Sequence, residues 1–295
     1  MGISMSQVMG NEPLCALLTA GALLMCCQGL EDPAVLQSSR RHWWMGVCLG
    51  LAVLTKVSAL LLVPVIAAVF FVALRKFGIA TIVAGLARCS VAAIAVSGWY
   101  YFRNWVEFDK PIVGGWDPVS GILWWQDPGY RTPEQMLTFG WSLFWPIHAG
   151  FHSIWDGFYS TLWFDGNLSG MGSARPPWNF SWMLAAAWPA LILTIAAAAG
   201  ALRSFRTSDT ALRRSLCLGS SVLILYLVAF AYLCLRVPVY SQAKASYTLG
   251  LTPFYALLCV AGLDLLPKHW AVRSAVWAFV LCWSVLAYGA YFVVG

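Results

Sequence analysis

The sequence predicts an all-α protein that crosses a membrane several times and carries a large loop on one side. The 295 residues are 60% hydrophobic and only 10% charged, with a mean hydropathy of +0.73, whereas soluble proteins contain about 25% charged residues. Several apolar segments also approach the roughly 20 residues that a helix needs to cross the bilayer. The 18 Lys and Arg residues stand in small groups between these segments, a pattern that sets membrane topology and argues against nucleic acid as a partner.

Six apolar segments are long enough to span a membrane as single helices: 12–29, 79–102, 182–202, 215–235, 248–266 and 272–293. Residues 40–75 are different, because one straight helix over this range would be about 50 Å long. We therefore expect a hairpin of two helices with Lys56 at the turn, of which the first is only about 13 residues long. The chain then has about eight membrane segments in total.

The distribution of cations supports the hairpin, because short loops rich in Lys and Arg remain in the cytoplasm. With a turn at Lys56, most cations of the short loops fall on that side: Arg40, Arg41, Arg75, Lys76, Arg203, Arg206, Arg213, Arg214, Lys268 and Arg273. A single span through Lys56 would place most of them outside. The hairpin also brings the Lys56 ammonium to the outer interface, whereas it would cost roughly 2.5–3.5 kcal/mol at the bilayer centre.

This topology divides the chain into membrane segments at 1–102, an outer loop at 103–181 and four further membrane segments at 182–295. The outer loop holds nine of the 17 tryptophans and seven of the 12 acidic residues. Its tryptophans suit either an aromatic belt at the membrane interface or walls that stack on sugar rings or hold an acyl chain. The nine cysteines lie in or beside apolar segments, so we interpret them as small buried hydrophobes rather than as a disulfide framework.

Four short stretches resemble the C-type (GT-C) membrane glycosyltransferases, polyprenyl-phosphate-sugar users related to protein O-mannosyltransferases and to the aminoarabinose transferase of lipid A. In chain order they are GNEPLCALL at 10–18, GLAVLTKVSALLLVP at 50–64, GWYYFRNW at 98–105 and KASYTLGLTPFYALL at 244–258. The resemblance implies a partial GT-C fold in a bacterial inner membrane. It also implies sugar transfer from a polyprenyl-phosphate donor to a lipid, glycan or protein acceptor on the extracytoplasmic face.

Two features depart from the family pattern. The acidic residue of the first stretch is Glu12, where many relatives have Asp. The family also begins with a helix and a long outer loop that supplies the principal catalytic carboxylate, whereas only ten residues precede Asn11 here. The chain thus resembles a family member without its front third, and we expect this length alone to lack transferase activity.

A lipid-phosphate donor requires cations for the departing phosphate and a base for the acceptor hydroxyl. The topology places four cations at the same outer level: Lys56, Arg103, Arg236 and Lys244. Arg103 and Lys244 are the preferred phosphate contacts, although each cation could instead anchor its helix by snorkelling. Tyr247 follows Lys244 by three residues and could bond a phosphate or sugar oxygen, or serve as an interfacial tyrosine.

Glu12 is the candidate catalytic carboxylate, as an acid that binds the acceptor or a metal. The alternative is that its charge stabilises the start of its helix, where Pro13 fits the first turn. His148, His152 and Asp156 recur at four-residue spacing, which on a helix places three ligand-capable side chains on one face. Because no HExxH or paired-cysteine pattern accompanies them, we prefer hydrogen bonds to backbone groups or sugar hydroxyls, with a divalent metal as the alternative.

Two other functions remain open. One is a transporter or flippase of lipid-linked glycans, although such proteins more often show internal repeats with broken helices, and the sequence shows no repeat of that kind. The other is a non-catalytic membrane assembly subunit, which the missing front would favour. A nucleotide-sugar donor is disfavoured, because the sequence contains no P-loop and no dinucleotide fingerprint.

Overall fold

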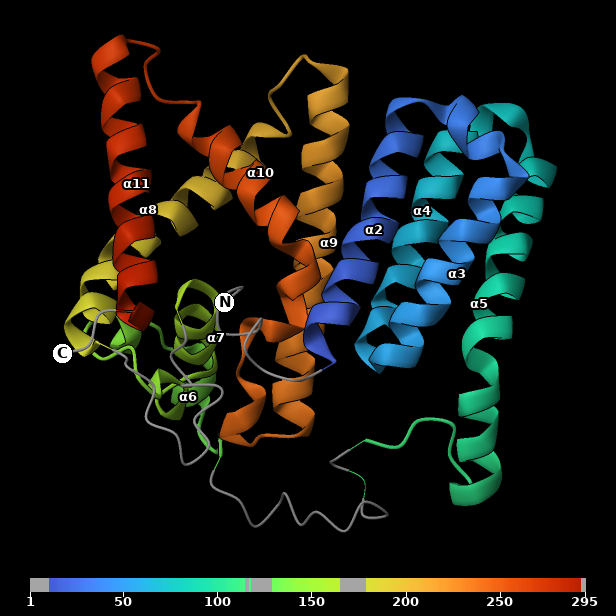
Figure 1. The fold of residues 1–295 in the computed structure, drawn as a ribbon, viewed down its shortest axis with the longest axis horizontal. Coiled ribbons are helices and arrows are strands. Elements are labelled where there is room, and N and C mark those ends of the chain that lie inside the picture. Colours follow the sequence, from blue (N-terminus) through green and yellow to red (C-terminus); the bar gives the residue numbers. More distant parts are fainter. Residues whose placement is uncertain (1–10, 115–116, 118–128, 165–178, 293–295) are drawn as a thin grey trace.

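The computed structural model describes residues 11–114, 117, 129–164 and 179–292. Within these residues the chain is helical, with no strand and one isolated bridge that pairs Gly129 with Val239. The long helices run up and down between two ends of the molecule (Figure 1). Among the described residues, seven segments are long and apolar enough to cross a membrane. The prediction of a polytopic α-helical membrane protein is therefore confirmed.

The first half of the chain forms a group of four antiparallel helices: α2 (Glu12–Glu31), α3 (Ser39–Thr55), α4 (Leu62–Leu74) and α5 (Ile79–Phe108). Lys56 ends α3 because its backbone is extended, with φ −157° and ψ 128°. A 3-10 turn over Val57–Leu61 then leads into α4, which runs back antiparallel to α3 and packs against α2 and α5. The predicted hairpin is confirmed, and its first helix has 17 residues rather than about 13 because it includes Ser39–Arg41.

α3 and α5 pack closely because two glycines of α3 face the backbone of α5. A Cβ at Gly46 would lie 2.3 Å from the carbonyl oxygen of Cys89, and one at Gly50 would lie 2.8 Å from that of Ala93. Small residues at such contacts are typical of membrane helices, which associate through close packing rather than through the hydrophobic effect. α3, with 17 residues, is shorter than the seven spanning segments and is not one of them, so the expected total of about eight stays a prediction.

The second half contributes α8 (Phe180–Arg203), α9 (Thr210–Arg236), α10 (Thr252–Leu263) and α11 (Trp270–Phe292). α8 and α10 cross with their backbones in contact, since a Cβ at Gly262 would lie 1.8 Å from the carbonyl oxygen of Ala196. The expected segment 248–266 is divided, because a 3-10 stretch over Ala245–Leu251 precedes α10. α9 joins the two halves through Leu218, Val222 and Tyr226, which share a buried cluster with α2, α3 and α4.

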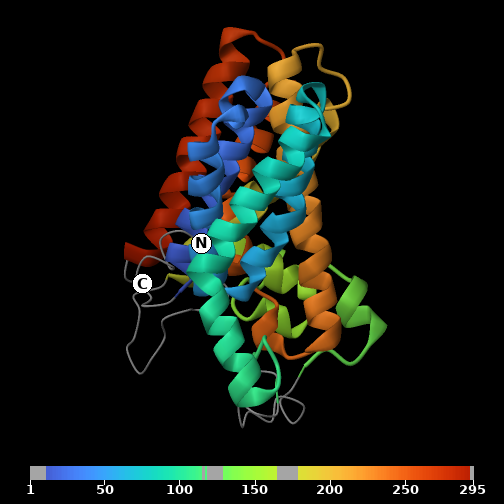
Figure 2. The same cartoon turned by 90° about the vertical axis from the view of Figure 1, so that its right-hand side faces the viewer.

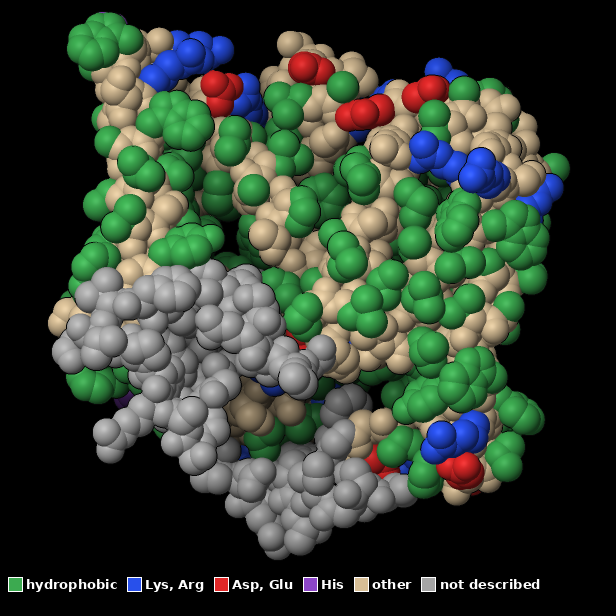
Figure 3. All heavy atoms as spheres, in the orientation of Figure 1, with side chains coloured by type: hydrophobic (Ala, Val, Ile, Leu, Met, Phe, Trp, Pro, Cys, Tyr) green, Lys and Arg blue, Asp and Glu red, His purple; other side chains and the backbone are tan. Residues whose placement is uncertain are grey.

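Most of the cations visible in Figure 3 lie at one end of the bundle, which we call the basic end. It is formed by the start of α3, the end of α4, the connection between α8 and α9 and the start of α11, and most cations of the short loops lie there, as the hairpin requires. Apolar side chains cover the flanks between the two ends. By the positive-inside rule we expect the basic end to face the cytoplasm.

The described part of the segment between α5 and α8 lies toward the opposite end, level with the lower part of α5 in Figures 1 and 2. It contains α6 (Pro133–Leu137) and α7 (Ile154–Trp163). α7 supports the chain that follows α9, because the Thr161 hydroxyl accepts the Ala245 N–H at 2.8 Å. Residues 1–10, 115–116, 118–128, 165–178 and 293–295, which include four of the loop's tryptophans, lie outside the described residues.

The cysteines follow the expectation only in part. Five are buried: Cys15, Cys26, Cys89, Cys234 and Cys259. Cys217 on α9 and Cys282 on α11 are exposed on the flanks of the bundle, and all nine cysteines are free thiols. The cysteines therefore form no disulfide framework, as expected. They are not all buried, because Cys27 and Cys48 are half-buried and Cys217 and Cys282 are exposed.

Candidate functional site

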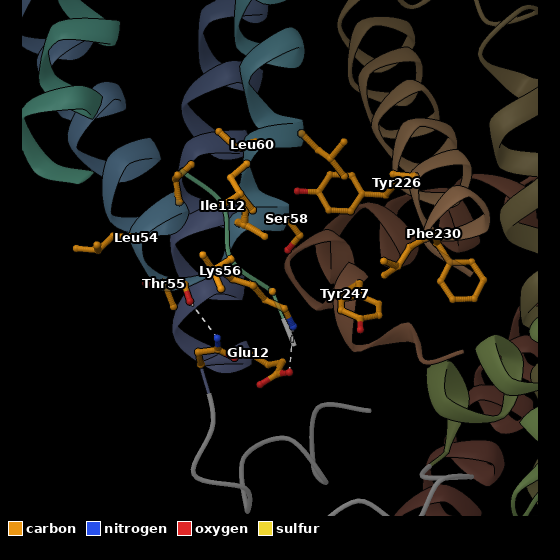
Figure 4. A pocket seen from close by; sticks show the side chains of 18 of the residues that line it. Glu12, Leu54, Thr55, Lys56, Ser58, Leu60, Ile112, Tyr226, Phe230 and Tyr247 are labelled. Atoms are coloured by element: carbon orange, nitrogen blue, oxygen red, sulfur yellow. Dashed lines mark hydrogen bonds and ion pairs between the residues drawn. The ribbon is translucent and has the colours of Figure 1, made fainter. Parts of the chain in front are cut away.

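A cavity of about 700 Å³ lies at the end opposite the basic end, between the α2–α5 group and α9. We call it the Lys56 cavity, and Figure 4 shows it from close by. Its walls combine apolar side chains with polar and aromatic ones from five different parts of the chain. The polar and aromatic members are Asn11, Glu12, Thr55, Lys56, Ser58, Tyr100, Tyr101, Asn104, Tyr226, Phe230, Tyr232, Gln242, Lys244 and Tyr247.

Lys56 projects from the turn between α3 and α4 toward the start of α2 (Figure 4). Its Nζ lies 3.0 Å from Oε1 of Glu12, and the two side chains are only 16% and 19% exposed. The same Nζ lies 4.5 Å from the ring centroid of Tyr247, which is within the range of a cation–π interaction. The start of α2 is held to the end of α3 by Asn11, whose Nδ2 donates to the Thr55 carbonyl oxygen at 3.0 Å.

Lys244 approaches the same tyrosine ring, with its Nζ 5.7 Å from the Tyr247 centroid. The Tyr247 hydroxyl is oriented by Gln242, to whose Oε1 it donates at 2.7 Å. Lys244 forms no ion pair with any described residue, whereas Lys56 is paired with Glu12. Two ammonium groups and one carboxylate therefore line the cavity, and its described walls carry an excess of positive charge that suits an anionic ligand.

Tyr101 and Asn104 were not selected from the sequence, although both lie in the stretch GWYYFRNW. They are three positions apart and therefore share a face of α5, and this face lines the Lys56 cavity. The Tyr101 hydroxyl donates to the Val53 carbonyl oxygen at 2.7 Å, and Asn104 is buried. The three-residue spacing in the sequence predicts that the two side chains share a helix face. Only the structure shows that this face lines the cavity.

Arg103 and Arg236 do not line the Lys56 cavity, although the sequence analysis placed them at the site. The side chain of Arg103 is 53% exposed, and its Nε forms an ion pair with Oε2 of Glu107 at 3.0 Å. Arg103 lies about 100° around α5 from Asn104, at the edge of the face that lines the cavity. Arg236 is likewise exposed, in the last turn of α9. The structure thus brings together Glu12, Lys56, Lys244 and Tyr247 and separates the two arginines from them.

His148, His152 and Asp156 do not share one helical face, which corrects the expectation from their spacing. His148 adopts a left-handed conformation with φ 51°, and α7 begins only at Ile154. His148 stacks on Phe151, and the His152 ring stacks on Trp141 with centroids 3.8 Å apart. Among the described residues no group of three His, Cys, Asp or Glu side chains could hold a metal ion.

Asp156 instead organises the loop that contains it. Its carboxylate is 1% exposed and accepts hydrogen bonds from the backbone of Gly140 and Ser142 at 3.0 and 2.8 Å. It also accepts bonds from the hydroxyls of Ser142 and Ser153. The preferred interpretation, hydrogen bonding to backbone groups, is confirmed for Asp156.

No protein-family model, curated protein or solved structure matches the chain. The resemblance to C-type glycosyltransferases therefore rests on the four short stretches quoted above. All four contribute to the Lys56 cavity: Glu12 comes from the first, Lys56 from the second, Tyr101 and Asn104 from the third, and Lys244 and Tyr247 from the fourth.

Proposed function

We propose that this protein is a membrane glycosyltransferase that moves a sugar from a polyprenyl phosphate to a lipid, glycan or protein acceptor. In this proposal the Lys56 cavity is the active site, and it lies at the extracytoplasmic face of a bacterial inner membrane. The observation that carries the proposal is the convergence of four family-like stretches on one cavity in which two ammonium groups meet one carboxylate. Among the described residues, Glu12, Lys56 and Lys244 are the charged side chains that line the cavity.

Lys244 and Lys56 are the proposed phosphate contacts. Negative charge grows on the phosphate as it leaves the sugar, and a preorganised ammonium in a half-buried site stabilises that charge. Lys244 is ready for this role because it forms no ion pair with a described residue. Lys56 must share its charge between the phosphate and Glu12, whose Oε1 is 3.0 Å away.

Glu12 is the proposed base. The acceptor oxygen attacks the anomeric carbon, the bond from that carbon to the phosphate oxygen breaks, and its electron pair remains on the phosphate. The hydroxyl proton of the acceptor passes to the Glu12 carboxylate. A phosphate that draws Lys56 toward itself weakens the ion pair with Glu12, which leaves the carboxylate oxygen available for this proton.

The margin of the cavity gives the prenyl chain access to the membrane. Leu60 and Tyr232 line the cavity and are 40% and 64% exposed on the flank of the bundle. An apolar chain attached to a phosphate inside the cavity can therefore leave between them and remain in hydrocarbon. Tyr100 and Tyr101 line another wall, where aromatic faces suit stacking on a sugar ring.

The test uses membranes that contain the chain, a photoreactive polyprenyl phosphate and a radiolabelled polyprenyl-phosphate sugar. Binding and transfer are measured separately, because binding requires only the cavity. Lys244→Gln is expected to weaken binding by about tenfold or more, since hydrogen bonds to charged groups contribute about 1.5–3 kcal/mol. Where transfer is detectable, losing a contact made in the transition state is expected to cost about 10²–10³ in turnover.

Arg236→Gln is the matched control, because it removes an exposed cation from the end of α9 without touching the cavity. Equal losses for the two variants would reject the assignment of the site. Absence of polyprenyl-phosphate binding would reject the proposed function itself. Movement of a lipid-linked sugar across the membrane without transfer would favour the flippase instead.

A further inference from the structure

A second hollow lies on the flank of the bundle, between α4 and α9, and has a volume of about 350 Å³. We call it the flank groove. Pro64, Ala68 and Val72 line it on α4, and Leu218 and Leu225 line it on α9. These side chains are apolar and lie within two of the spanning segments. The groove is therefore open to hydrocarbon rather than to water.

Arg214 marks the end of the groove that is nearest the basic end. Its Nη1 donates to the carbonyl oxygen of Leu30 at 2.7 Å, which holds the guanidinium beside the end of α2. A guanidinium has five N–H donors, so this bond leaves donors for a further acceptor. No acidic residue lines the groove, and Arg75 follows Val72 by about one turn at the same end.

The length of the groove matches one leaflet of a bilayer. On α4 it extends from Pro64 to Val72, about 12 Å at the helical rise, and on α9 from Arg214 to Leu225, about 17 Å. Half of a hydrocarbon core of about 30 Å is about 15 Å. A chain that begins at Arg214 therefore ends near the middle of the membrane.

We propose that the flank groove binds an anionic phospholipid of the leaflet at the basic end, with its phosphate on Arg214 and one acyl chain between α4 and α9. The inference does not depend on the proposed glycosyltransferase activity. The Arg214 guanidinium is complementary to a lipid phosphate, and the apolar groove between α4 and α9 is as long as the acyl region of one leaflet. A polyprenyl phosphate bound in the Lys56 cavity would place its phosphate at the opposite end of the bundle.

The chain contains its own reporter for this site. Cys217 is exposed and lines the groove, whereas Cys282 is exposed on α11 outside it. The protein in detergent is alkylated with a maleimide while phosphatidylglycerol or phosphatidylcholine is added, and both cysteines are followed by peptide mass spectrometry. Phosphatidylglycerol is expected to slow the alkylation of Cys217 at least tenfold and to leave that of Cys282 unchanged. Phosphatidylcholine is expected to need a concentration roughly tenfold higher for the same protection of Cys217.

Arg214→Gln is expected to abolish the difference between the two lipids. Arg213→Gln is the matched control, because it removes a neighbouring exposed cation that does not line the groove. Since Arg214→Gln also removes the bond to Leu30, a second pair of variants keeps Arg214. Ala68→Trp fills the groove and is expected to release one retained phospholipid in native mass spectra, whereas Val63→Trp, on the lipid-facing side of α4 outside the groove, is not.

Equal protection by both lipids, or equal effects of the two arginine variants, would show a general lipid annulus and overturn the proposal. Protection by inorganic phosphate alone would overturn the role of the acyl chain. Polyprenyl phosphate could also protect Cys217 from alkylation. If Lys244→Gln removed this protection and Arg214→Gln did not, the groove would belong to the ligand of the Lys56 cavity instead.

Discussion

Glu12 and Lys56 are 44 positions apart in the sequence, yet their charged atoms are 3.0 Å apart. Removing two charges largely from water costs several kcal/mol per ion, so such a pair is weak grounds for stability. Its presence beside Lys244 and Tyr247 is what the proposed binding of an anionic ligand would require. The sequence showed each residue as unusual in its segment, but it could not show the pairing, which depends on how α2 lies against the hairpin.

Asp156 provides a prediction at the scale of one residue. Asp156→Ala leaves the buried N–H groups of Gly140 and Ser142 without an acceptor, and each such loss costs about 1–3 kcal/mol. We expect a destabilisation of at least about 2 kcal/mol, measured as faster proteolysis between α5 and α8 and a lower midpoint of thermal unfolding. Glu134→Ala, at an exposed acid in α6, is the control. A rise of the wild-type midpoint on adding a divalent metal would contradict the structural role.

The ion pair between Asp264 and Arg203 predicts a pH dependence at the basic end. The hydrogen bond from Arg203, 2.8 Å long, holds the pKa of the Asp264 carboxyl below its usual value, and the charges of Lys268 and Arg273 add to this effect. A lowered pKa in the folded state stabilises the protein above the unfolded pKa of about 3.9, and this stabilisation disappears as the pH falls through the folded value.

Asp264→Asn is therefore expected to lower the unfolding midpoint at pH 7 and to have no effect at a pH below the folded pKa. The difference at neutral pH is expected to be small, about 0.2–1 kcal/mol, because the pair is partly exposed. Thermal unfolding of both proteins across pH 2–7 measures it. A difference that grows as the pH falls would have the wrong sign.

At the scale of elements, the sequence located the helices well and their orientations poorly. Helix positions follow from length and hydropathy, so the expected segment 182–202 matches α8 within two residues, whereas α5 begins at Ile79 as expected but continues to Phe108, into the predicted outer loop. The side of α5 that faces the cavity depends on its packing against α3, through Gly46 and Gly50, and membrane helices show little contrast between buried and lipid-facing sides. For this reason the sequence analysis predicted Arg103 as a phosphate contact, whereas the structure places the neighbouring Asn104 in the cavity wall.

The crossing of α8 and α10 predicts a strong contrast between two glycines. Gly262→Ala would place a methyl group 1.8 Å from the Ala196 carbonyl oxygen, so the helices must separate, which costs about 1–3 kcal/mol for overpacking. At Gly21 in α2 no atom lies within 4 Å of the added Cβ, and Ala is the better helix former by up to about 1 kcal/mol. Thermal unfolding in detergent is expected to show a lower midpoint for Gly262→Ala only. Equal midpoints would contradict the observed backbone contact.

At the scale of the whole molecule, the alternation of cations and apolar segments predicts the arrangement observed. Most cations of the short loops lie at one end, and the Lys56 cavity lies at the other. The architecture between the ends was less accessible to the sequence. α9 joins the two halves of the chain, and α7 supports the residues around Lys244. Both arrangements depend on contacts between residues more than 80 positions apart, such as the hydrogen bond from the Ala245 N–H to the Thr161 hydroxyl.

The topology can be tested with single cysteines and a membrane-impermeant thiol reagent applied to intact cells. Glu134→Cys, in α6, is expected to react from outside, because α6 lies at the end of the bundle opposite the cations. Ser208→Cys, in the exposed connection between α8 and α9, is expected to react only after the cells are opened. The reverse pattern would invert the protein in the membrane and place the Lys56 cavity in the cytoplasm.

The turn at Lys56 also has a consequence for how the protein enters its membrane. During synthesis, α3 emerges before α4, and by itself it has only 17 residues and is followed directly by Lys56. An ammonium group is costly within the bilayer. We therefore expect α3 to be stable in the membrane only after α4, whose sequence is continuously apolar, has crossed the membrane in the opposite direction. On this basis we expect the two helices to insert as one unit, with Lys56 carried across the lipid at the turn between them.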